Sequence, residues 1–182
     1  MKKILFITVI VIVGILIGIY AYLGGFTKVE VRIEEQGGEV LVYENMKGDY
    51  KNTGKVLEKI YYSLLNDDKI ETYKGFGYYL DNPDEVSKED LRSEIGVILE
   101  PKDYDKIPEL EKKYLVRTFP KKEYIVTEFP YKNMASIYMN IIKAYPAVFA
   151  FFDKGGYQWD GGTLEIYDMP AKKTFFRSDF KK

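Results

Sequence analysis

The chain has 182 residues, a formal net charge of −1 and neither cysteine nor histidine. Its length predicts one domain with a substantial core. The missing residue types exclude disulfides, thiolate nucleophiles, imidazole bases and the usual zinc sites, and we expect no metal and no cofactor. The sequence shows no basic arm or stripe, so nucleic acid is not an expected partner.

The N-terminus carries an uncharged apolar run, Ile4–Leu23. It is about 20 residues long, which as a helix spans the core of a bilayer. A cleaved signal peptide is the alternative, but the run is longer than a typical signal-peptide core and no A-x-A site follows it. We therefore predict an uncleaved transmembrane anchor over residues 1–25 and a folded domain over residues 26–182. Lys2 and Lys3 precede the run, so the positive-inside rule predicts a cytoplasmic N-terminus with the domain outside.

The first half of the domain contains alternating segments that predict strands and one amphipathic segment that predicts a helix. The helix is expected to be capped by Thr53 and to run to about Asn66, because its apolar residues form a single stripe. The predicted strands are Val29–Ile33, Glu39–Glu44, Gly75–Leu80 and Arg92–Leu99.

The second half repeats this order. A helix is predicted from Asn133 to about Tyr145, broken or kinked at Pro146 and resumed to Phe152. The predicted strands are Leu115–Phe119, Lys122–Phe129, Thr163–Tyr167 and Lys173–Arg177. Each half thus runs strand, strand, helix, strand, strand, which predicts an α+β fold built from a duplicated unit with its helices on one face of a sheet.

The segment Gly161–Pro170, GGTLEIYDMP, contains the most informative strand. Its alternation places Leu164 and Ile166 on one face and Glu165 and Tyr167 on the other. If the apolar pair packs on the helices, Glu165 looks out from the opposite face of the sheet. Glu165 is then either an ordinary glutamate on a half-solvated sheet or the single charge at the floor of an aromatic-lined groove.

Several motifs, taken in order, resemble the GyrI-like family, a small-molecule-binding fold also found as the effector domain of multidrug-sensing transcription activators. The resemblance extends over roughly Thr27 to Arg177. It rests on VYENMKGDY within Glu39–Tyr50, YYLDNP at 78–83, LRSEIG at 91–96 and LEIY at 164–167. It implies two tandem strand-helix-strand-strand units that form one antiparallel sheet around a central groove.

The resemblance also implies a ligand site. Glu165 occupies the position of the family's central acid, which meets cationic aromatic ligands, and Tyr167 is the aromatic residue of the same motif. A carboxylate among aromatic rings attracts a cation by Coulomb and cation–π interactions, and its pKa is expected to be raised when the site is empty. We name Tyr43, Tyr78 and Trp159 as candidate aromatic neighbours, although core packing explains each of them equally well.

A closer resemblance is to a testis-expressed ER-phagy receptor of animals, a single-pass ER membrane protein with a cytosolic GyrI-like domain. That receptor depends on a long disordered tail with a short autophagy motif, whereas this chain ends at Lys182, so we do not expect the autophagy role. A bacterial inner membrane fits the sequence better, with the ER membrane and a cytosolic domain as the alternative.

These features support three hypotheses about function. The first is a membrane-anchored module that binds small amphipathic or cationic aromatic molecules. The second is a hydrolase of reactive small molecules such as cyclopropane-containing compounds, with Glu165 as general base on water. The third is a membrane scaffold that binds an unknown protein partner and leaves the groove unused.

Overall fold

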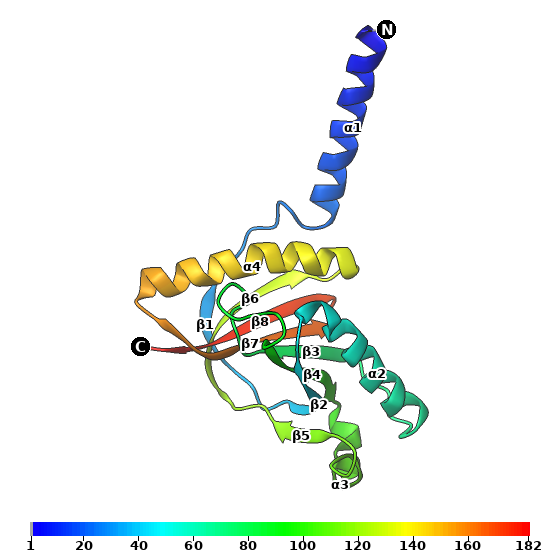
Figure 1. Cartoon of the computed structure of the whole chain (residues 1–182), viewed down its shortest axis with the longest axis vertical. Coiled ribbons are helices and arrows are strands. Elements are labelled where there is room, and N and C mark those ends of the chain that lie inside the picture. The colour runs from blue at the N-terminus through cyan, green and yellow to red at the C-terminus, as the bar shows by residue number, and fades with distance from the viewer. Residues whose placement is uncertain (1) are drawn as a thin grey trace.

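The computed structural model describes residues 2–182, so Met1 lies outside the described residues. One antiparallel sheet of eight strands dominates the domain, in the order β1-β6-β8-β7-β3-β4-β2-β5 (Figure 1). The strands are β1 (Arg32–Gln36), β2 (Val40–Lys47), β3 (Lys74–Tyr79), β4 (Arg92–Leu99), β5 (Leu115–Thr118), β6 (Lys122–Pro130), β7 (Gln158–Asp168) and β8 (Lys173–Lys181). The helices are α1 (Lys2–Tyr22), η1 (Tyr50–Asn52), α2 (Thr53–Asn66), η2 (Pro101–Lys106), α3 (Ile107–Leu110) and α4 (Met134–Gly155).

The sheet is built from two units with the same order of elements. One unit is β2-α2-β3-β4 and the other is β6-α4-β7-β8, and β3 pairs with β7 where the two units meet. The leading strand of each half crosses over, because β1 pairs with β6 of the second unit and β5 pairs with β2 of the first. The predicted α+β fold of two tandem strand-helix-strand-strand units is therefore confirmed.

Helices α2 and α4 cover the same face of the sheet. On α2, Ile60 and Leu64 pack with Val42 and other strand residues, and on α4, Val148 packs on Ile125. Helix α4 has a capping box at Asn133, where the sequence predicts the helix to begin. It runs through Pro146 without a break and continues to Gly155, beyond the predicted Phe152. The N-cap of α2 is Asn52, one residue before the predicted Thr53.

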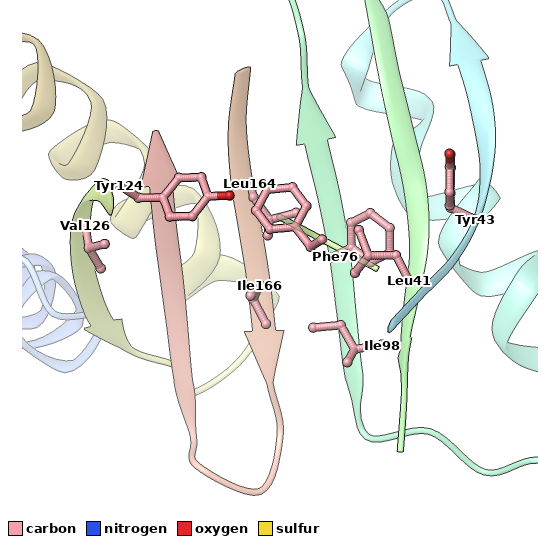
Figure 2. Packing of buried hydrophobic residues seen from close by; sticks show 9 residues of the cluster. Leu41, Tyr43, Phe76, Ile98, Tyr124, Val126, Leu164 and Ile166 are labelled. Atoms are coloured by element: carbon pink, nitrogen blue, oxygen red, sulfur yellow. The ribbon is translucent and has the colours of Figure 1, made fainter. Parts of the chain in front are cut away.

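The face without helices has a core of its own, so the condition on which Glu165 would look away from the helices is not met. Leu164, Ile166 and Tyr124 belong to this cluster (Figure 2). Phe119 is a further member. The apolar pair of β7 therefore packs away from the helices, and Glu165 points toward them. Alternation alone was insufficient because the neighbouring strands also carry apolar side chains on this face, and Phe119 from the connection between β5 and β6 packs with them.

Several element boundaries differ from the sequence prediction. Strand β1 lies about three residues later than expected, and β8 continues to Lys181. Strand β7 begins at Gln158 and passes through Gly161 and Gly162, where the pairing with β8 shifts between Trp159 and Thr163. A glycine pair that reads as a turn is thus accommodated as an irregularity inside a long strand.

Two helices of the described residues, α1 and α4, are long and apolar enough to cross a membrane, a weak indication by itself. No residue of α1 is buried, whereas α4 packs on the sheet. Figure 1 shows α1 projecting from the domain on the side of α4.

Candidate functional site

The centre of the candidate site is Glu165, a carboxylate enclosed between β7 and α4. It is only 2% exposed. Its neighbours across the sheet are Gly77 on β3 and Phe176 on β8. The Tyr145 hydroxyl on α4 donates to Oε1 and the Tyr167 hydroxyl donates to Oε2, each over 2.8 Å. Both carboxylate oxygens are therefore held by phenol groups rather than by cations.

The electrostatics of Glu165 follow from this environment. Burial raises its pKa to about 7, although the hydrogen bonds from Tyr167 and Tyr145 lower it in part. Burial and the Glu165 charge in turn raise the pKa of Tyr145 and of Tyr167 well above the usual value of a phenol. Near neutral pH the carboxyl group of Glu165 is therefore partly protonated and partly ionised, while both tyrosines keep their protons and remain hydrogen-bond donors.

Glycines on β3 make room for aromatic side chains beside Glu165. Residues that face each other across two strands share one face of the sheet, so Gly77 lies on the Glu165 side. The ring of Tyr79 covers Gly77, since a Cβ at that position would stand 2.8 Å from it. Tyr50 packs edge-on against Tyr79 with ring centroids 4.8 Å apart. The floor of the site is therefore a carboxylate bordered by tyrosines from four parts of the chain.

Of the residues named from the sequence, the structure brings Glu165 and Tyr167 together. Tyr43 and Tyr78 lie on the opposite face, where they pack with the helix-free core. Trp159 packs with the cluster around Phe152 near the C-terminal end of α4.

Tyr43 and Tyr78 have a packing role on their own face. The guanidinium carbon of Arg117 lies 5.6 Å from the Tyr43 ring centroid and 5.5 Å from that of Tyr78. Arg117 also bonds Glu94 over 2.6 Å, and Tyr78 donates to Asp179. These contacts stabilise the helix-free face and do not reach Glu165.

Three tyrosines near Glu165 were missed from the sequence, namely Tyr50, Tyr79 and Tyr145. A signal existed for Tyr79, because it shares the period-2 face of Gly75 and Gly77. Finding Tyr145 from the sequence would have required knowing which face of α4 meets β7. Tyr50 lies in a short 3-10 turn and joins the group only through tertiary contact.

Two surface hollows lie away from Glu165. One of about 520 Å³ is bordered by Tyr73, Lys74, Glu100, Pro101, Lys102, Asp168, Pro170 and Ala171. The other, of about 330 Å³, lies along the linker after α1 and the ends of β6 and β8. Glu165 lines neither hollow, and its buried carboxylate is capped by the hydroxyls of Tyr145 and Tyr167. Among residues 2–182 no cluster of acidic side chains is arranged to hold a metal ion.

Comparisons with known proteins agree on the family and the fold. The family model described as the GyrI-like small molecule binding domain matches residues 29–176. No curated protein matches the chain, so the resemblance to the ER-phagy receptor stays a prediction.

Two solved structures illustrate the similarity in fold. The crystal structure of the EcmrR C-terminal domain has a TM-score of 0.60 at 12% identity, covering 85% of this chain and 98% of that one. The structure of SAV2435 bound to tetraphenylphosphonium has a TM-score of 0.52 at 13% identity, and the match covers 84% of this chain and 94% of that one. At such low identity the likeness shows the fold alone.

Proposed function

Because the chain belongs to the GyrI-like small molecule binding domain family, we propose that it binds amphipathic or cationic aromatic molecules at Glu165. The observation that carries this proposal is a carboxylate buried to 2% exposure whose hydrogen bonds come from two tyrosines. A buried carboxylate without a cationic partner is costly to the folded protein. A cationic ligand would supply the missing charge.

The surrounding rings would add to this attraction. Tyr145, Tyr167 and Tyr79 lie near the carboxylate. A cation over the face of such a ring gains cation–π energy that grows as water is excluded. Tetraphenylphosphonium, the compound bound by SAV2435, combines a permanent positive charge with four phenyl rings. We therefore choose it as the first probe for this chain.

We further propose that α1 anchors the domain to a membrane, with residues 1–25 as the anchor and residues 26–182 as the binding domain. Support comes from the length and apolar composition of α1 and from the exposure of its whole surface. The cysteine-free chain offers a direct test of orientation. A single cysteine introduced at the exposed Lys88 should react with a membrane-impermeant maleimide on intact spheroplasts, whereas a cysteine at Lys3 should not.

Thermal unfolding of the full chain in detergent tests the binding proposal. A ligand at about 100 times its dissociation constant stabilises the folded state by roughly 2.7 kcal/mol, which is a shift of several degrees for a domain of this size. We expect tetraphenylphosphonium to raise the melting temperature of the wild type but not of Glu165→Gln. The neutral compound triphenylphosphine oxide serves as the control. Equal shifts for both proteins would contradict the proposal.

The hydrolase alternative has its own test. Product analysis of mixtures of the protein with cyclopropane compounds would reveal hydrolysis.

A further inference from the structure

Helix α4 carries an exposed apolar stripe that the folded domain does not cover. Met134, Tyr138, Ile142 and Phe149 are 60%, 65%, 68% and 44% exposed. Their spacing of four, four and seven residues places them along one side of the helix. Between Asn133 and Phe152 the only charged residue is Lys143. Exposed apolar surface of this extent on one element is typical of an interaction site.

The same helix is tied to the end of α1. Lys132, just before α4, reaches the Tyr22 carbonyl oxygen and stacks over the Tyr22 ring at 4.8 Å. Lys143 donates to the Gly25 carbonyl oxygen over 2.7 Å and also to that of Thr27. These contacts fasten the first half of α4 to the residues at which α1 ends.

The geometry indicates which surface the stripe meets. Helix α1 has 21 residues, about the length that crosses the hydrocarbon core of a bilayer. Its end would therefore lie at the boundary between lipid and water, where Tyr20 and Tyr22 are the residues expected. In Figure 1, α4 runs across the end of α1 and lies between α1 and the strands. A helix in that place is at the level of the lipid headgroups and has its sheet side turned away from them.

We propose that the exposed stripe of α4 lies against the bilayer, so that the domain is held flat on the lipid surface by two contacts, α1 and α4. The proposal rests on the membrane anchoring proposed above and does not depend on Glu165 binding a ligand. Apolar contact is the main attraction, because the domain beyond α1 has more acidic than basic residues and gains little from anionic lipid. Since Tyr145 of α4 also covers Glu165, the helix that contacts lipid forms one wall of the ligand site.

Tryptophan fluorescence in vesicles of brominated phosphatidylcholine tests this placement. The chain has one tryptophan, so Trp159→Phe provides an unlabelled background. Three single probes are then added to the full chain in that background. Ile10→Trp reports on α1, Ile142→Trp reports on the stripe, and Tyr104→Trp reports on η2. Element η2 leads into α3, which Figure 1 places at the far end of the molecule from α1.

We expect the bromine atoms to quench the probes at positions 10 and 142 and to leave the probe at position 104 unquenched, in the absence of any ligand. Quenching at position 10 without quenching at 142 would overturn the inference and leave the anchor in place. A blue-shifted but unquenched probe at 142 would mean that a second copy of the chain covers the stripe, and would also overturn it. Quenching at all three positions would show adsorption of the whole surface rather than contact through α4, and no quenching at position 10 would remove the anchor on which the inference depends. Either result would also overturn the inference.

Discussion

The hydroxyl of Tyr145 on α4 lies 2.8 Å from Oε1 of Glu165 on β7. This hydrogen bond joins helix α4 to strand β7 at the centre of the sheet, where the two halves of the domain meet. Because it is made to a buried carboxylate, its strength depends on the ionisation of Glu165. The stability of the fold, its response to pH and its affinity for cations are therefore expected to be coupled at this one residue.

Stability should fall as Glu165 ionises. Its pKa is raised from 4.5 to about 7 on folding, so between these values the folded state binds more protons than the unfolded state. The stabilising effect of the proton is complete below pH 4.5 and is lost as pH rises through 7. Relative to Glu165→Gln, the wild type should lose up to about 3 kcal/mol of unfolding free energy over this range. Urea unfolding of both proteins at pH 4.5 and 8 checks this, and parallel pH profiles would contradict it.

Removing the Tyr145 hydroxyl should destabilise the domain mainly when Glu165 is charged. Tyr145→Phe deletes a donor to a buried carboxylate, a change that costs roughly 1–3 kcal/mol. We expect that loss at pH 8 and a smaller one at pH 5, measured by urea unfolding. Tyr138→Phe on the same helix is the matched control, because Tyr138 is 65% exposed. An equal loss at both pH values would show that the bond does not depend on the charge.

Two glycines should respond to alanine in opposite directions. A Cβ at Gly96 would stand 2.0 Å from the Val42 carbonyl oxygen, where the backbone of β2 has no room to yield. We expect Gly96→Ala to cost several kcal/mol or to prevent folding. A Cβ at Gly54 in the first turn of α2 meets nothing within 4 Å, so Gly54→Ala should stabilise by about 0.5–1 kcal/mol. Melting temperatures of the two variants check the pair, and a tolerated Gly96→Ala would show that the close packing of β2 on β4 is wrong.

Substitutions on the two faces of the sheet should have different effects on ligand affinity. Tyr43→Phe and Tyr78→Phe alter the helix-free face and should leave the affinity for tetraphenylphosphonium within about twofold. Tyr79→Ala removes a ring beside Glu165 and should weaken binding by about 0.5–2 kcal/mol, the range for a cation–π contact. Isothermal titration of the three variants measures the difference. A large loss in Tyr78→Phe would move the site to the opposite face.

The sequence was sufficient to predict the fold, and it singled out two of the residues that the structure brings together in the candidate site. Period-2 alternation and the repeated order of elements predicted the duplicated α+β unit, and the Glu-Ile-Tyr motif singled out Glu165 and Tyr167. The sequence did not reveal which face of the sheet Glu165 occupies. Leu164 and Ile166 form an apolar face of β7 that could equally pack on helices, whereas in the structure they pack in the helix-free core. Tyr145 was missed because its contact depends on how α4 is rotated over the sheet. Tyr43 and Tyr78 were chosen by strand position, but they point to the helix-free core.

The most direct test of the central claim is the affinity for tetraphenylphosphonium as a function of pH. If the cation binds only when Glu165 is ionised, a pKa of about 7 makes the wild-type Kd roughly tenfold tighter at pH 8 than at pH 6, following the ionised fraction. Glu165→Gln should bind weakly at both pH values, and the neutral triphenylphosphine oxide should show no pH dependence with either protein. A Kd that is the same for wild type and Glu165→Gln would contradict the account and remove Glu165 from the binding site.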